Sequence, residues 1–331
     1  GGERITTIGT DGCVKLWEVK KGYQAPLEVG TVAKARMKID LWPNDIAVNP
    51  FSQDQLLLSL GDTNKYRLSV CQFNPWPVAK RVRNINTQHT HQLTCVDFGL
   101  PTTTETVFMS GSRSGAIHSI MLPTAEFKLL FQYPEQGVGL NSLCSNHDID
   151  QILAGTEDGK LVVGKALASN FAQSTYQILP SHPFSPSSPP DSEGHERRRT
   201  GVVHVVGAKT GSSKSLCVCI SQDHLERKKN EVLCSYVDLR TPKGVVWESW
   251  FPWKETGNIG PPAWNEEKGQ FLCGGIGKVN VFDTRKKGQG LCFHMPDEKQ
   301  VIRQVLKTAA ATNSEYVLAS GSNLILSNIM S

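Results

Sequence analysis

Short apolar segments alternate along the chain with turns rich in glycine, aspartate, asparagine and proline. Runs with a helical spacing of apolar residues are hard to find, whereas runs with strand character dominate. The segments follow a repeating order: one apolar segment, a second that ends in small residues, a turn, and a third of alternating character. This pattern predicts an all-β fold made of repeated antiparallel units.

The third segments mark the repeat best, because they align along the whole chain. Their starting residues are separated by 53, 50, 44, 71, 47 and 45 residues. A four-stranded unit cannot bury both of its faces alone, so such units stack around a ring as the blades of a propeller. We therefore expect residues 1–331 to form one domain, a seven-bladed β-propeller of four-stranded antiparallel blades. The third segments are CVKLWEV from Cys13, YRLSVCQF from Tyr66, AIHSIML from Ala116, KLVVGKAL from Lys160, EVLCSYVDLR from Glu231, KVNVFDTR from Lys278 and NLILSNIM from Asn323.

Three stretches carry a family resemblance. The opening stretch TIGTDGCVKLWEVKKG places Asp11 in a hairpin turn and Trp17 near the end of the following strand. His89 precedes the apolar positions of LTCVDF, and Phe282 is followed by Asp283. On these residues the chain resembles the WD-repeat β-propeller family, where they match the turn aspartate, the strand-end aromatic and acidic residues, and the buried histidine. The resemblance implies structural roles for Asp11, Trp17, His89 and Phe282.

Other repeats depart from that motif. Ile120 and Gly164 replace the tryptophan, and Ser114 replaces the turn aspartate. The blade count would be six or eight if a loop hid a strand.

The order of segments at the two ends predicts an incomplete ring. The chain opens on a second segment and ends on a third, so one inner strand and one outer strand are missing. Soluble proteins avoid exposed, unpaired strand edges. We therefore expect an upstream segment or a partner's strand to close the ring; the alternative is a first blade capped by a loop.

Composition and charge limit the partners, cofactors and cellular compartments that we expect for this protein. The net charge of +4 permits an acidic partner without favouring nucleic acid. The nine cysteines include no CxxC pair, and no histidine pair has zinc spacing, so we expect no metal and no cofactor. No apolar run is long enough to span a membrane, and GGERITTIG does not resemble a signal peptide. We therefore expect no membrane association and a reducing compartment, the nucleus or the cytoplasm.

Two polar interruptions decorate the predicted ring beside blade five. Residues 179–200, rich in proline and serine, are expected to form a disordered inter-blade loop in which Ser185 and Ser188 match proline-directed phosphorylation. The second interruption, residues 222–231, lies in the hairpin of blade five. Together they carry a basic group that could bind an acidic or phosphorylated peptide or a nucleic-acid backbone, although interleaved acidic residues also fit plain solvated loops. The basic residues are Arg197, Arg198, Arg199, Arg227, Lys228 and Lys229.

Tryptophans cluster in the run WESWFPWKETGNIGPPAW. Trp247 and Trp250 point to opposite faces if they share a strand, so both cannot enter one apolar layer. Tryptophan is enriched at interface hot spots, and we therefore expect Trp250 and Trp253 to contact a partner. The alternative is that they fill gaps between blades five and six.

Two predicted strands end in Asp-x-Arg, formed by Asp238 with Arg240 and by Asp283 with Arg285. By resemblance to the family, a Trp-Asp-x-Arg box implies docking on the adaptor of a cullin-type ubiquitin ligase. The same tripeptide also forms structural turns, in which the arginine pairs with a carboxylate.

Catalytic motifs are missing, because neither GTEDGK nor GGIGK has phosphate-loop spacing and no GxSxG occurs. We therefore do not expect an enzyme. The leading hypothesis is a non-enzymatic scaffold or adaptor subunit of a multiprotein complex, which binds partners through one loop-rich face and blade five. The alternatives are a substrate receptor of a cullin-type ubiquitin ligase, and a reader of a modified or acidic peptide or a nucleic-acid backbone.

Overall fold

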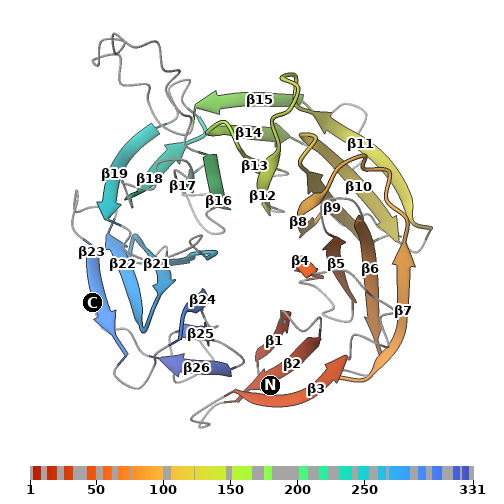
Figure 1. Cartoon of the computed structure of the whole chain (residues 1–331), viewed down its shortest axis with the longest axis horizontal. Helices are drawn as coiled ribbons and strands as arrows, with labels where there is room; N and C mark the ends of the chain where they lie inside the picture. Colours follow the sequence, from red (N-terminus) through yellow and green to blue (C-terminus); the bar gives the residue numbers. More distant parts are fainter. Residues whose placement is uncertain are drawn as a thin grey trace.

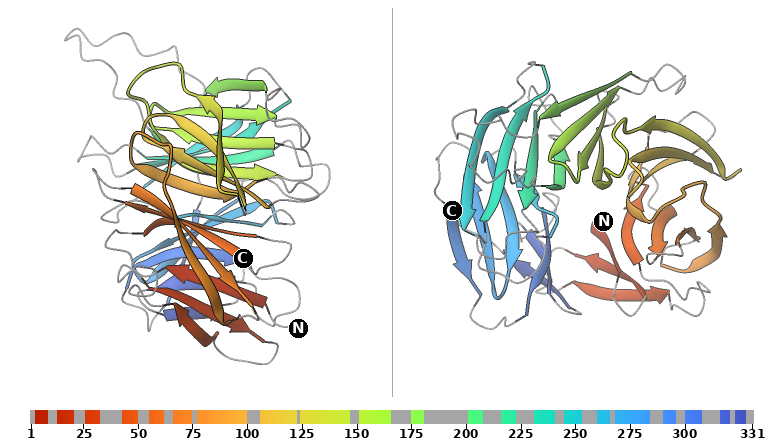
Figure 2. Two further views of the ribbon diagram at one scale, coloured as in Figure 1. Left: turned by 90° about the vertical axis from the view of Figure 1, so that its right-hand side faces the viewer. Right: turned by 45° about the horizontal axis from the view of Figure 1, so that its top comes forward.

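The described strands form a ring of antiparallel sheets around a central opening, which is the architecture of a β-propeller (Figure 1). The computed structural model contains strands and no helix among the residues that it describes, and Figure 2 shows the same sheets from two other directions. The described residues are 3–8, 13–20, 26–32, 43–49, 55–61, 66–74, 77–99, 106–122, 124–146, 151–165, 175–180, 201–207, 216–222, 231–240, 245–252, 260–265, 268–283, 290–295, 300–307, 316–320 and 323–327.

Five sheets have four strands and two have three, and the strands of each sheet are consecutive in the chain. The first three sheets consist of β1 (Glu3–Ile8), β2 (Val14–Val19) and β3 (Leu27–Val32); β4 (Pro43–Val48), β5 (Gln55–Gly61), β6 (Tyr66–Phe73) and β7 (Ala79–Ile85); and β8 (Leu93–Phe98), β9 (Thr106–Ser112), β10 (Ala116–Leu122) and β11 (Glu126–Gln132).

The other four sheets complete the ring. They consist of β12 (Leu140–Asn146), β13 (Gln151–Thr156), β14 (Lys160–Lys165) and β15 (Thr175–Pro180); β16 (Gly201–Gly207), β17 (Leu216–Gln222), β18 (Glu231–Asp238) and β19 (Val245–Pro252); β20 (Ala263–Asn265), β21 (Gln270–Gly275), β22 (Lys278–Asp283) and β23 (Gly290–His294); and β24 (Ile302–Lys307), β25 (Tyr316–Ser320) and β26 (Asn323–Ser327).

The strands confirm the all-β prediction and its segment order. Each of the seven predicted third segments contains a strand, namely β2, β6, β10, β14, β18, β22 and β26. Within the described part of the chain, the first sheet begins at β1 without a strand on its inner side, and the last ends at β26 without one on its outer side.

Apolar side chains between neighbouring sheets hold the ring together. Leu16 of β2 packs with Leu56 and Phe73 of the second sheet, and all three are almost fully buried. On the other face of the first sheet, Trp17 packs with Val317 of β25, so the first and last sheets share a core cluster. Inner-lying strands such as β5 and β21 bury both faces and therefore read as nearly continuous apolar runs.

Aspartate side chains link three neighbouring inner strands. Asp45 of β4 accepts a hydrogen bond from the backbone N–H of Val96 in β8 at 3.0 Å, and Asp97 of β8 accepts one from the backbone N–H of Ser145 in β12 at 2.6 Å.

Five inner strands also share a bulge near their first residue. Such a bulge adds one residue to the strand and increases its local twist. The five bulges lie between Pro43 and Asp45, Leu93 and Cys95, Leu140 and Ser142, Val202 and His204, and Ile302 and Gln304.

Candidate functional site

Two hairpin turns on the same face of the ring share one backbone geometry. In the β9–β10 turn, the Gly115 N–H donates to the carbonyl of Ser112 at 3.0 Å. In the β13–β14 turn, the Gly159 N–H donates to the carbonyl of Thr156 at 3.2 Å. Both glycines have positive φ, 76° and 78°, a conformation that other residues adopt only with strain.

The side chains inside the two turns differ in chemistry. In the first turn the hydroxyls of Ser112 and Ser114 lie 2.8 Å apart. In the second, the Thr156 hydroxyl lies within hydrogen-bond distance of the Asp158 carboxylate and accepts the Lys160 backbone N–H at 2.8 Å. The contact inside the first turn is therefore between neutral hydroxyls, with the Arg113 side chain exposed, whereas the contacts inside the second involve a carboxylate.

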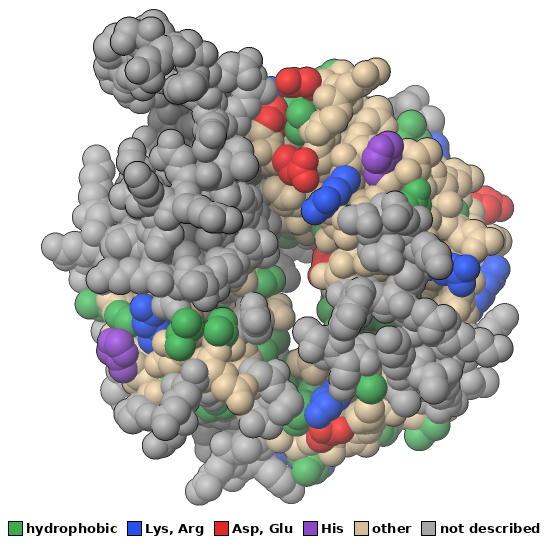
Figure 3. Space-filling model, viewed as in Figure 1, with side chains coloured by type: hydrophobic (Ala, Val, Ile, Leu, Met, Phe, Trp, Pro, Cys, Tyr) green, Lys and Arg blue, Asp and Glu red, His purple; other side chains and the backbone are tan. Residues whose placement is uncertain are grey.

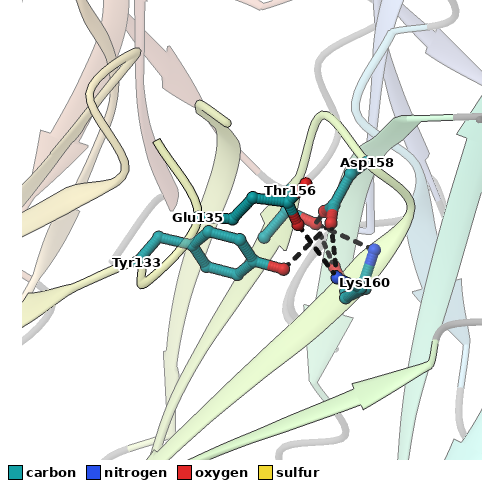
Figure 4. A network of polar contacts seen from close by, with 5 residues as sticks. All are labelled: Tyr133, Glu135, Thr156, Asp158 and Lys160. Atoms are coloured by element: carbon teal, nitrogen blue, oxygen red, sulfur yellow. Dashed lines mark hydrogen bonds and ion pairs between the residues drawn. The ribbon is translucent and has the colours of Figure 1, made fainter. Parts of the chain in front are cut away.

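A network of polar contacts surrounds Asp158 (Figure 4). The Tyr133 hydroxyl donates to its Oδ2 at 3.0 Å, and the Lys160 Nζ lies 2.8 Å from the same oxygen. Lys160 also lies 3.6 Å from the Glu135 carboxylate and 5.6 Å from the centroid of the Tyr133 ring. Residues from the β11–β12 connection and from the β13–β14 hairpin thus meet at one carboxylate.

Protonation in this network follows from burial and pairing. Burial raises the pKa of Tyr133, so its phenol stays protonated. For Asp158 burial acts in the opposite direction to hydrogen bonds from Lys160, Thr156 and Tyr133, and these bonds win, so its pKa is lowered. The hydrogen bond to Asp158 raises the pKa of Lys160. At neutral pH the network therefore keeps the Asp158–Lys160 ion pair, with Glu135 as the second carboxylate near Lys160, an arrangement suited to holding a surface in shape.

The chain segments around the two turns are tied together by backbone contacts. The Arg113 N–H donates to the carbonyl of Gln92 at 2.9 Å, and the Tyr133 N–H donates to the carbonyl of Gly115 at 3.0 Å. The Gly139 N–H donates to the Glu157 carboxylate at 3.1 Å. The β7–β8 and β11–β12 connections and the two hairpins thus form one bonded layer.

Exposed residues on this layer form what we call the turn surface. Figure 3 shows acidic side chains gathered over β13 and β14, with a basic and a histidine side chain beside them over the neighbouring sheet. The turn surface carries both positive and negative side chains, and the hydrogen-bonded layer beneath it holds its backbone in place. Its members are Thr90, His91, Arg113, Pro134, Glu135, Gln136 and Glu157, all exposed.

A buried histidine pair lies beneath the β9–β10 turn. His89 is 4% exposed, and its Nε2 lies 2.8 Å from the Ser110 hydroxyl. Its ring meets the edge of the His118 ring, with centroids 4.3 Å apart. Burial, and then the neighbouring His118, lower the pKa of His89 to about 3, and burial lowers that of His118 as well. Both imidazoles are therefore neutral at physiological pH.

The other described motif residues lie in the core. Trp17 is 7% exposed and its Nε1 donates to the Thr7 hydroxyl at 2.9 Å. Phe282 is buried and stacks on Phe271, with ring centroids 4.8 Å apart.

Asp238 and Arg240 pair with each other at the end of β18. The Arg240 Nε donates to Asp238 Oδ1 at 2.9 Å, and a terminal guanidinium nitrogen donates to Oδ2 at 2.7 Å. The pair lowers the pKa of Asp238. This is the geometry of a structural turn, although the guanidinium remains 63% exposed. Asp283 is buried at the end of β22.

Most of the predicted partner-binding residues fall outside the described part of the chain. Trp250 lies in β19, where the structure describes only the backbone. The structure therefore places none of the predicted binding side chains of blade five. The predicted site residues that lie outside the described ranges are Asp11, Ser185, Ser188, Arg197, Arg198, Arg199, Arg227, Lys228, Lys229, Trp253 and Arg285.

Sequence reasoning missed the Tyr133–Asp158–Lys160 network. One signal was available, because Asp158-Gly159 repeats the Asp11-Gly12 pair of the opening hairpin at the end of a second segment. Tyr133 gives no such signal, since its partner lies 25 residues further along the chain.

Comparison with known proteins adds no assignment: no protein-family profile matches the chain, and no curated protein sequence matches it significantly. Within the described ranges, no group of three or more His, Cys, Asp and Glu side chains is placed to hold a metal ion. The same ranges contain no helix long and apolar enough to cross a membrane.

Proposed function

We propose that the protein is a non-enzymatic interaction scaffold, an adaptor subunit that holds partner proteins of a complex on the face carrying the turn surface. The observation that supports this most is the bonded layer beneath that surface, in which Tyr133, Asp158 and Lys160 hold the β11–β12 connection against the β13–β14 hairpin. A preformed surface loses little conformational entropy on binding. The proposal also agrees with the predicted chemistry of blade five, whose basic and tryptophan residues would add a second contact area.

The propeller itself is part of the proposal. We propose a seven-bladed ring of the WD-repeat type, in which the β1–β3 and β24–β26 sheets are the first and last blades. A strand from an upstream segment or from a partner would then pair with the side of one of these sheets on which the described strands end. A nuclear or cytoplasmic location is proposed on the composition, and all nine cysteines are free thiols.

Affinity purification of the tagged protein from cells tests the proposal. Partners should remain near one-to-one after a high-salt wash, and Trp250→Ala or Trp253→Ala should reduce their amount. Loss of every partner at high salt would contradict the scaffold, because salt weakens contacts that depend on phosphate or on charge alone.

Variants separate the two alternatives in the same experiment. A reader of an acidic peptide or a nucleic-acid backbone should lose its ligand when Arg227, Lys228 and Lys229 are neutralised. A ligase receptor should retain a cullin adaptor and lose it in Arg285→Ala or Arg240→Ala. Because the Arg240 guanidinium binds Asp238 within its own turn, unfolding midpoints must accompany that second variant.

A further inference from the structure

The cysteines of this chain differ sharply in exposure. Of the nine, six are buried, Cys13 and Cys144 are half-buried, and Cys292 alone is exposed. Burial raises the pKa of Cys95 to about 12 and also raises the pKa of Cys273, so these thiols stay protonated. Since the thiolate is the reactive form and needs access to its reagent, thiol chemistry is concentrated at Cys292.

Cys292 has a second reactive group beside it. His294 follows two residues later on β23, so both side chains point to the same face of the sheet. The Cys292 Sγ lies 3.8 Å from the His294 Nε2, and His294 is exposed as well. A nucleophile within hydrogen-bond reach of a base is the arrangement that activates side chains for covalent chemistry. The imidazole tautomer with its proton on Nδ1 leaves Nε2 free to accept the thiol proton.

The pair lies at the outer rim between two sheets. Cys292 is opposite Asn280, which is opposite Cys273, so the three side chains share one face. That face is directed toward the β16–β19 sheet, because Cys273 interacts with Cys234 of β18. Figure 1 shows β23 following β19 along the rim. An adduct on Cys292 would therefore occupy the outer edge between these two sheets.

We infer that Cys292 is a site of covalent modification by small-molecule disulfides, with His294 as the group that accepts its proton. The thiol proton moves to His294 Nε2, and the Cys292 sulfur attacks one sulfur of the reagent. A new sulfur–sulfur bond forms as the bond of the reagent breaks. The imidazolium then gives its proton to the leaving thiolate or, when that thiolate is too weakly basic, to solvent. Cys292 is oxidised, half of the reagent is released as a thiol or thiolate, and His294 is again neutral.

The reaction of the folded protein with the aromatic disulfide dithionitrobenzoate tests this inference. Release of the coloured thiolate gives the rate, and peptide mapping gives the position of the adduct. We expect one fast-reacting thiol that is lost in Cys292→Ser and retained in Cys13→Ser. At pH 7, His294→Gln should react about fivefold or more slowly than the unsubstituted protein, since a positioned base is lost. At pH 9.5 the two rates should converge, because hydroxide then removes the proton without help.

Two results would overturn the inference. The first is an adduct that maps mainly to another cysteine of the folded protein. The second is a reaction rate of His294→Gln at pH 7 equal to that of the unsubstituted protein. Both side chains are exposed, so equal thermal unfolding midpoints of the variants should show that the rates compare folded proteins.

Discussion

The β9–β10 and β13–β14 turns reach the same backbone shape through different chemistry. In the first, two serine hydroxyls lie inside the turn and a neutral histidine lies beneath it. In the second, a carboxylate is paired with Lys160 and accepts the hydroxyl of Tyr133. The features they share are the glycine with positive φ and its hydrogen bond three residues back. The glycine and the backbone therefore define the turn, and the side chains determine how its stability responds to pH and salt.

The largest effect should come from the shared feature. In Gly115→Ala the new Cβ would lie 2.6 Å from Tyr133 Cβ and 2.7 Å from the carbonyl oxygen of Val138, and both contacts are closer than real Cβ atoms tolerate. With the positive φ added, we expect a loss of about 3 kcal/mol or more in the free energy of unfolding. Urea denaturation measures it.

Gly137→Ala is the matched control for that substitution. Gly137 also has positive φ, 82°, but a Cβ there meets nothing within 4 Å. We expect about 1 kcal/mol for the backbone conformation alone. Equal losses at both positions would show that the packing of the turn against Tyr133 contributes nothing.

Removing one polar side chain from each turn should lower the stability of the protein by different amounts. Asp158→Ala leaves the Tyr133 hydroxyl and the Lys160 ammonium without their shared acceptor, and we expect a loss of about 2 kcal/mol. Ser114→Ala removes one neutral hydroxyl contact and should cost about 1 kcal/mol or less. A thermal melt of both variants suffices, and a larger loss for Ser114→Ala would reverse our account of the two turns.

Acid should affect the β9–β10 turn through the buried His89 beneath it. Its pKa is about 3 when folded, against about 6.5 in an unfolded chain, so the unfolded state binds the proton first. The stability that His89 contributes is therefore complete above about pH 6.5 and is lost as the pH falls toward 3. Relative to the unsubstituted protein, His89→Gln should gain about 2 kcal/mol between pH 6.5 and pH 4.5. Urea denaturation at the two pH values checks this.

Asp45 provides a control of opposite sign. Burial raises its pKa to about 7, so its contribution is present below about pH 4 and is lost as the pH rises through 7. Asp45→Asn should therefore gain stability relative to the unsubstituted protein as the pH rises from 5 to 7. The account of His89 fails if the difference between His89→Gln and the unsubstituted protein is the same at both pH values.

Salt should change stability least, and it should do so through the Lys160–Asp158 ion pair of the β13–β14 turn. Lys160 is 30% exposed and its ion pair with Asp158 is partly screened by water. We expect Lys160→Met to lose less than about 1 kcal/mol in low salt, and the loss should shrink in 1 M salt. Unfolding at both ionic strengths provides the comparison, and a loss that grows with salt would contradict the role of the ion pair.

The repeat could be predicted from sequence because it depends on local patterns. Each third segment combines β-forming residues, most with a preceding Gly-containing turn, and each contains a strand. The burial of His89 agrees with what the WD-repeat resemblance implied, and Trp17 is buried as well.

Contacts between strands and between blades could not be predicted in this way. At Gly164, where the WD-repeat motif that the sequence resembles has tryptophan, a Cβ would lie 2.4 Å from the ring of Tyr176 on the adjacent strand β15. An aromatic ring from the neighbouring strand thus lies over the position at which this chain has no aromatic residue, and single-strand patterns do not reveal this. The Asp45 and Asp97 contacts across the inner strands are equally invisible, because their partners lie 51 and 48 residues away.

Charge reversal on the turn surface tests the proposed scaffold most directly. Glu135→Lys with Glu157→Lys inverts two exposed charges there, and Glu126→Lys makes the same change at the opposite end of β11. In affinity purification from cells with a high-salt wash, we expect a partner retained near one-to-one by the unsubstituted protein and by Glu126→Lys, and lost from the double variant. Equal retention by all three, or no partner near one-to-one on the unsubstituted protein, would contradict a scaffold that binds through this surface.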